Sequence, residues 1–106
     1  MPEQCTYTEA DIEKIVAGLQ ILGMDLKESI FLMPDSVIKN YLLFETAKII
    51  EFKTANDFYY MQNKISRMMD LVIRFELEGK TLELLEEISM EIKKIVQYIE
   101  REREVL

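Results

Sequence analysis

The chain has 106 residues but no histidine and only one cysteine, Cys5, and these shortages exclude several kinds of chemistry. Histidine is the commonest general base and the commonest nitrogen ligand for zinc or iron. Its absence excludes nucleophilic catalysis of the Cys-His and Ser-His types. A single cysteine cannot form an intramolecular disulfide, which fits a reducing compartment.

Glycine, proline and long apolar runs are also scarce. The 3 glycines and 2 prolines leave little material for long loops or disorder. The longest unbroken apolar stretches, residues 30–33 and 41–44, are far shorter than the ~20 residues that cross a bilayer. The first residues show no basic segment followed by an apolar one. We therefore expect a cytoplasmic protein with no membrane contact.

The remaining composition is that of one acidic globular domain spanning residues 1–106. Hydrophobic residues make up 49% and charged residues 31% of the chain, and the formal net charge is −7. The acidic excess is divided almost evenly between the two halves of the chain. Because nucleic-acid affinity depends on Lys and Arg neutralising phosphates, this balance argues against nucleic-acid binding.

Helix-capping residues and three-four apolar spacing predict two helices in the first third of the chain. Thr8 is a candidate N-cap for a first helix that ends at Gly23. Asp25 and Glu28 have the spacing of a capping box, which predicts a short helix through Leu32, ended by Pro34.

Three further helices are predicted after residue 34. Asp35 or Ser36 caps a helix that runs to about residue 53. Thr54 opens a long helix that ends at residue 78, with Gly79 as its stop, and Thr81 caps a last helix to about residue 103. No segment shows sustained strand-type alternation. The fold class predicted is therefore all-α, with four to five helices in a small bundle and two long C-terminal helices that are antiparallel.

The apolar surface of these helices predicts a homodimer. The helix over residues 37–52 is apolar nearly all round, and that over residues 55–78 has a wide apolar arc. Four substantial helices do not offer enough surface to cover both. We therefore expect a homodimer in which these two helices contribute to the interface. A tight monomeric bundle is the alternative.

A charged stripe lies opposite the apolar arc of the helix over residues 55–78. Arg67, Asp70 and Arg74 fall on one side at the spacing that favours ion pairs along a helix. Such a stripe is typical of a solvated face, and its alternative role is contact with a partner. Gly79, Lys80 and Thr81 follow it and resemble the end of a phosphate-binding loop. Arg74 occupies the position where that loop needs a glycine, so we interpret the tripeptide as a helix boundary.

Two acids fall in apolar sectors of their helices. Glu45 and Glu76 are candidates for buried, functionally perturbed carboxylates. The alternative is that each pairs with a lysine such as Lys48 or Lys64, or lies at the rim of the core.

The last helix carries an acidic cluster whose spacing suggests a Mg²⁺ or Mn²⁺ site of the kind found in helical nucleotide hydrolases. Three of its acids, Glu83, Glu86 and Glu87, lie across the helix from its apolar stripe, so we predict no metal site and no cofactor. The cluster consists of Glu83, Glu86, Glu87 and Glu91.

The segment GMDLKESIFLMPDSVIKNYL, residues 23–42, resembles the helix-turn-helix of bacterial transcription regulators. The likeness lies in a glycine, a Lys-Glu pair four residues later, a polar cap and a helix that begins Val-Ile-Lys. It implies a DNA-binding function, which Lys39 and Lys48 would support and which Glu45 and Glu51 oppose.

Together these features predict a small, non-catalytic protein that acts through protein-protein contact as a regulatory, adaptor or structural element. The predicted partners are a second copy of the chain and an unidentified protein. Two alternatives stay open: a helix-turn-helix regulator that binds nucleic acid, and a carboxylate-metal-dependent nucleotide hydrolase.

Overall fold

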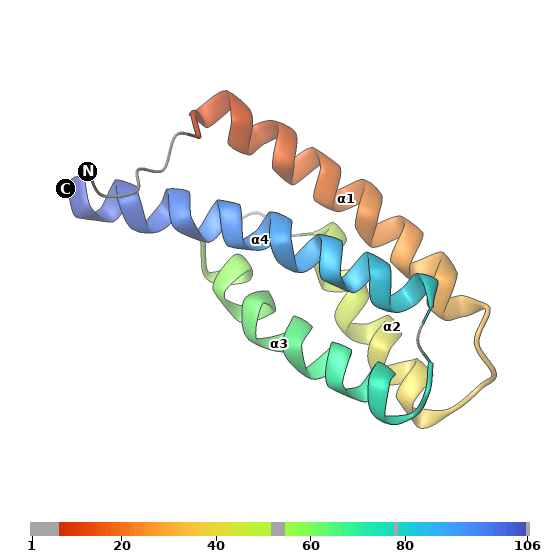
Figure 1. Cartoon of the computed structure of the whole chain (residues 1–106). Helices are drawn as coiled ribbons and strands as arrows, with labels where there is room; N and C mark the ends of the chain where they lie inside the picture. The colour runs from red at the N-terminus through yellow and green to blue at the C-terminus, as the bar shows by residue number, and fades with distance from the viewer. Residues whose placement is uncertain (1–6, 52–54, 78, 106) are drawn as a thin grey trace.

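A computed structural model describes residues 7–51, 55–77 and 79–105 and confirms the all-α prediction. Within these residues the chain forms four helices and no strand: α1 (Glu9–Phe31), α2 (Val37–Ile50), α3 (Ala55–Arg74) and α4 (Lys80–Val105). Consecutive helices run in opposite directions, and the two long C-terminal helices are antiparallel, as predicted (Figure 1). Cys5 lies outside the described residues.

The four helices enclose one core, but they do not contact each other equally. α1 packs along both α2 and α4, and α3 packs along α4, whereas α2 and α3 approach each other over few residues. Every helix contributes side chains to the same buried cluster. Its fully buried members include Leu19, Leu26, Ile30, Leu42, Ile49, Met61, Ile65, Met68, Leu85, Ile88, Ile92 and Ile95.

α1 is one continuous helix. It begins as predicted at Thr8, whose hydroxyl accepts the Asp11 N–H at 3.2 Å while the Asp11 carboxylate accepts the Thr8 N–H at 3.0 Å. The predicted stop at Gly23 is wrong. A Cβ placed on Gly23 would lie 3.1 Å from Ile50 Cγ1 and 3.2 Å from Ile49 Cγ2. This glycine therefore permits close packing of α1 on α2 and does not end a helix.

The second predicted helix start, at Asp25 and Glu28, is also wrong. Both residues lie inside α1, which ends where the Leu32 N–H donates to the Glu28 carbonyl at 3.3 Å. The capping-box spacing here is a coincidence of sequence, because the backbone on both sides is already helical.

Two residues between α1 and α2, Asp35 and Ser36, are predicted as caps of α2, and the structure shows which of them acts as one. Ser36 is the N-cap, and its hydroxyl accepts the Lys39 N–H at 3.0 Å. Asp35 instead forms an ion pair with Lys39 Nζ at 3.2 Å, and Lys39 Nζ also donates to the Met33 carbonyl at 2.8 Å. α2 ends at Ile50, before the predicted residue 53. Residues 52–54, including the predicted cap Thr54, lie outside the described residues.

α3 ends earlier than predicted, at Arg74. Glu76 has a φ of 56°, the Glu76 N–H donates to the Ile73 carbonyl at 3.2 Å, and the Leu77 N–H donates to the Val72 carbonyl at 2.7 Å. This is a Schellman motif with a glutamate at the position where glycine is usual. A local backbone motif, invisible in the apolar spacing, therefore ends the helix before residue 78, which lies outside the described residues.

α4 begins one residue before the predicted cap. Gly79, at φ 107°, has a carbonyl that accepts the Glu83 N–H at 3.1 Å, so Gly79 takes the N-cap position. Thr81 is not the cap. It is buried in the first turn, where its hydroxyl pairs with the Ser29 hydroxyl of α1. The Gly-Lys-Thr tripeptide is thus a helix start, in keeping with our interpretation of it as a boundary.

Candidate interaction surfaces

The outer side of α1 carries a row of exposed apolar side chains. Met24 is 60% exposed, Phe31 65% and Leu32 82%, and Ile21 continues the row toward the N-terminus. These positions follow three-four spacing on the side of α1 that faces away from the core. The sequence pattern does not reveal this row, because a helix boundary predicted at Gly23 assigns residues 21 and 24 to different helices.

The row borders a groove of about 410 Å³ between α1 and α2. We call it the α1–α2 groove; it is lined by Met24, Lys27, Glu28, Phe31, Leu32 and Ile50. Its walls are largely apolar, with one cation and one carboxylate at the rim. Lys39 Nζ lies 5.1 Å from the centre of the Phe31 ring and holds that ring by a cation–π contact.

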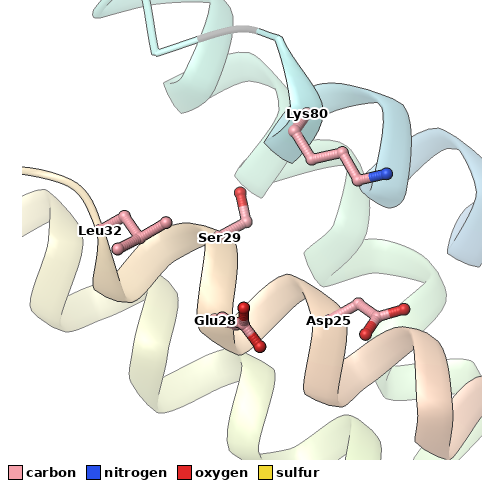
Figure 2. Close-up of a pocket in the computed structure, with 5 residues that line it drawn as sticks. All are labelled: Asp25, Glu28, Ser29, Leu32 and Lys80. Carbon is pink, nitrogen blue, oxygen red and sulfur yellow. The ribbon is translucent and has the colours of Figure 1, made fainter.

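A second, more polar hollow of about 350 Å³ lies where the last turns of α1 meet the start of α4. Figure 2 shows Asp25, Glu28, Ser29 and Leu32 projecting from α1, with Lys80 projecting from α4. Glu28 and Leu32 also line the α1–α2 groove, so the two hollows share one ridge. Throughout the part of the chain that the structure describes, no three Cys, Asp or Glu side chains gather as metal ligands would.

The sparse contact between α2 and α3 is bridged by polar side chains around Glu45. This residue is only 2% exposed, and its carboxylate lies 3.2 Å from Lys48 Nζ and 3.7 Å from Lys64 Nζ. The Tyr60 hydroxyl also donates to it at 3.2 Å. One carboxylate of α2 therefore holds two ammonium groups and a phenol, two of which come from α3.

Aromatic rings surround the ammonium group of Lys48. Lys48 Nζ donates to the Tyr60 hydroxyl at 2.8 Å, and it lies 4.5 Å from the centre of the Phe44 ring and 4.6 Å from that of Tyr60. The hydrogen bond to Tyr60 and the Glu45 carboxylate raise the pKa of Lys48. Burial raises the pKa of the Tyr41 hydroxyl, and Glu45 adds to that increase.

The predicted site residues are distributed unevenly. Glu45 is buried and pairs with Lys48 and Lys64, the two lysines considered from the sequence. Glu76 is exposed at the end of α3, so its predicted place in an apolar sector is wrong. It fell outside that sector because α3 had already ended at Arg74.

Arg67, Asp70 and Arg74 are all exposed on α3, as predicted for a solvated stripe. The ion pairs expected among them are not formed. In the described part of the chain the ion pairs join other residues: Asp35 with Lys39, Glu45 with Lys48 and Lys64, and Glu91 with Lys94. Within the described ranges, neither arginine has an ion-pair partner.

The remaining sequence patterns have simple structural explanations. Glu83, Glu86 and Glu87 are exposed, and Glu91 lies 2.7 Å from Lys94 Nζ. Residues 23–42, which resemble a helix-turn-helix, form the second half of α1 and the start of α2, which fold back on each other (Figure 1). Lys39 is 8% exposed there and is committed to Asp35 and the Met33 carbonyl.

None of the helices, over the residues described, combines the length and the apolar character that a bilayer-spanning segment needs. We compared the chain with protein-family models, with curated proteins and with solved structures. No match was found in any of the three.

Proposed function

We propose that this protein is a non-catalytic regulatory or structural element that binds another protein through the α1–α2 groove. The observation that carries the proposal is the exposed row formed by Ile21, Met24, Phe31 and Leu32. Large apolar side chains gathered on one face are typical of sites where proteins associate. The expected cytoplasmic location is part of this proposal.

The shape of the groove favours a helical occupant. A cleft between two helices receives the apolar side of an amphipathic helix, whose anchors occupy successive turns. Met24 suits such a site because its side chain adapts to irregular contacts. Lys27 and Glu28 at the rim supply one charge of each sign for orientation.

A second copy of the chain is the occupant that we propose, in keeping with the predicted homodimer. We place this interface on α1 and α2, because the apolar arc of α3 is used in the protein's own core.

Light scattering on two matched variants tests the proposal. Met24 is 60% exposed and lines the groove, whereas Met90 is 62% exposed and lies on α4. We expect a dimer for the wild type and for Met90→Lys, and a monomer for Met24→Lys.

A wild-type protein that is monomeric in light scattering would contradict the proposed homodimer. A benzophenone amino acid at position 24 or at position 90, used in an extract of the source cells, then tests for a different partner. Equal cross-linking from the two positions would contradict the groove as a binding site.

A further inference from the structure

The side of α1 that faces away from the core has a sequence that complements itself when it is read in the reverse direction. α1 lies along one margin of the bundle, so this side is open along its length (Figure 1). We infer that it binds the same side of a second copy, with the two α1 helices antiparallel and their centre between Gln20 and Ile21. The arrangement rests on the homodimer proposed above and specifies how the two copies meet.

We call this side the α1 outer face; it consists of a central row and two flanking rows, each repeating every seven residues. The central row runs from small to large side chains: Ala10, Ala17, Met24 and Phe31, all exposed. In helices that pair along a left-handed seam, residues seven apart lie on one line. In an antiparallel pair with this centre, Ala17 of each copy faces Met24 of the other. Ala10 faces Phe31 in the same way, so every contact of the row joins a small side chain to a large one.

The flanking row on the α2 side places opposite charges at equal distances from the centre. Glu13 and Lys27 are each seven residues from Gln20, whose amide donates to the Ile50 carbonyl of α2 at 3.4 Å. In an antiparallel pair the same edges of the two helices lie side by side, so Glu13 of each copy meets Lys27 of the other. Glu51, an exposed acid of α2, follows Ile50 and therefore lies level with the uncharged Gln20.

The flanking row on the α4 side has the reverse order of charge. Lys14 and Glu28 are each seven residues from Ile21, so Lys14 of each copy meets Glu28 of the other. At the centre of this edge the two Ile21 side chains, each 62% exposed in the single chain, pack against one another. Within the described ranges, none of the four charged residues of the two rows takes part in an ion pair. The antiparallel pair supplies each of them with a partner.

The other charged residues of α1 fit the same arrangement. Glu9 and Asp25 are its two remaining exposed acids. In the antiparallel pair Asp25 lies close to Lys14 of the other copy, and Glu9 lies about one turn from the contact made by Lys27. Asp11 accepts the N–H of the helix's N-cap residue at 3.0 Å. Each lysine of the α1 outer face therefore meets an acidic edge of the other copy, although the face as a whole carries more acids than lysines.

The antiparallel direction is selected by side-chain size. The flanking charges are compatible with either direction, because each paired acid is also next to a lysine in the sequence. In a parallel pair, however, each residue of the central row faces its own equivalent, so Ala10 faces Ala10 and Phe31 faces Phe31. The helix axes would then be close at one end and separated at the other, which leaves unfilled space beside the alanines.

This arrangement also fills the α1–α2 groove. The first half of α1 from the other copy lies over Met24 and Phe31, which line the groove. A surface that complements itself in size and in charge is what a twofold interface requires, because both copies contribute the same residues. An unrelated protein would need the same pattern in the reverse order.

Complementary charge variants test the pairing. Lys14→Glu/Lys27→Glu leaves only acids in the flanking rows, and Glu13→Lys/Glu28→Lys leaves only lysines. We expect each variant alone to have a dimer dissociation constant at least about tenfold above that of the wild type, because like charges then meet. We expect an equimolar mixture of the two variants to form heterodimers, which native mass spectrometry identifies by mass.

A control variant changes the charge elsewhere. Lys93→Glu/Arg101→Glu alters the net charge as much as the first variant does, at exposed positions of α4. We expect it to change the dissociation constant of the dimer less than about twofold. Circular dichroism checks that every variant keeps its helix content.

Engineered disulfides test the direction, in a chain that also carries Cys5→Ser. Ile21→Cys places the two thiols side by side at the centre of an antiparallel pair, so we expect oxidised glutathione to link the copies. Ala10→Cys places them about 30 Å apart in that pair, which is beyond the reach of a disulfide, and side by side in a parallel pair. We therefore expect no link from position 10.

The outcomes separate this arrangement from the homodimer itself. A dimeric wild type would contradict the arrangement if the mixed charge variants formed no heterodimer, if the α4 control weakened the dimer equally, or if position 10 formed the link and position 21 did not. Each of these results would leave the homodimer in place. A monomeric wild type would overturn both.

Discussion

Glu76 is the one described residue other than glycine that has a positive φ, at 56°. A side chain with a Cβ is strained in this left-handed region, and glycine is not. The residue is exposed, so the strain is not compensated by burial of its side chain. At the residue scale this position is therefore suboptimal for stability.

Replacement of Glu76 tests this reasoning. We expect Glu76→Gly to increase the free energy of unfolding by about 0.5–1 kcal/mol, because it removes the steric cost at the end of α3. Glu76→Ala is the control, since alanine keeps the Cβ and gives no such gain. Urea denaturation measures both, and equal stabilities of the two variants would contradict the argument.

The surroundings of Glu45 are partly predictable from the sequence, whereas those of Glu76 are not. The helical wheel placed Glu45 in an apolar sector, and Lys48 is a neighbour three residues away on the same helix. Its contacts with Tyr60 and Lys64 depend on how α3 lies against α2, which no spacing within one helix encodes. The exposed position of Glu76 is not predictable from the helical wheel, because the Schellman motif depends on backbone conformation and the glycine that usually marks it is missing.

At the element scale, α1 shows why local signals were insufficient. Gly23 and the Asp25–Glu28 spacing both have the form of helix boundaries. Tertiary packing decides otherwise, because the Ile49 and Ile50 side chains of α2 lie against α1 at Gly23. The helix starts with a side-chain cap, at Thr8 and Ser36, are among the predicted caps, and the end of α1 near Leu32 is predicted from Pro34. The end of α3, formed by backbone hydrogen bonds without a glycine, is not predicted.

The two glycines of α1 form a matched pair. Gly18 has nothing within 4 Å of an added Cβ, so Gly18→Ala should gain up to about 1 kcal/mol from helix propensity. Gly23→Ala gives the same gain in helix propensity, but the added Cβ forces the Ile49 and Ile50 side chains away. We therefore expect a net loss of about 1 kcal/mol in the free energy of unfolding. Thermal denaturation of both variants measures the difference. If Gly23→Ala were as stabilising as Gly18→Ala, the close packing would be refuted.

At the scale of the whole molecule, the bundle consists of two helical hairpins that contact each other closely through α1 and α4. On the opposite side, Glu45 connects α2 to α3 through Tyr60 and Lys64. The all-α class and the helix order follow from composition and apolar spacing. The pairing of hairpins does not, because several arrangements bury the same stripes.

This connection predicts an alkaline loss of stability. The pKa values of Lys48 and Tyr41 are raised in the fold, in each case with a contribution from Glu45. A raised pKa means that the folded state holds the proton more tightly. The stabilisation is therefore complete below the ordinary values of 10.0 for tyrosine and 10.5 for lysine, and it is lost as pH rises through the folded values.

Chemical denaturation between neutral pH and about pH 11 measures this loss. We expect Glu45→Gln to lower the free energy of unfolding by about 2 kcal/mol at neutral pH, because it leaves two ammonium groups without their carboxylate. We also expect the alkaline decline to be shallower in this variant. The exposed Glu83→Gln is the control, and a decline as steep in Glu45→Gln as in the wild type would refute the connection.

The dependence of the core on α4 has a consequence for biosynthesis. This last helix supplies Leu85, Ile88, Ile92 and Ile95 to the buried cluster, and it closes the bundle against α1, the first helix. During synthesis, the apolar sides of α1, α2 and α3 consequently stay open until α4 has left the ribosome. During that interval the nascent chain is a natural client for chaperones that shield apolar surface.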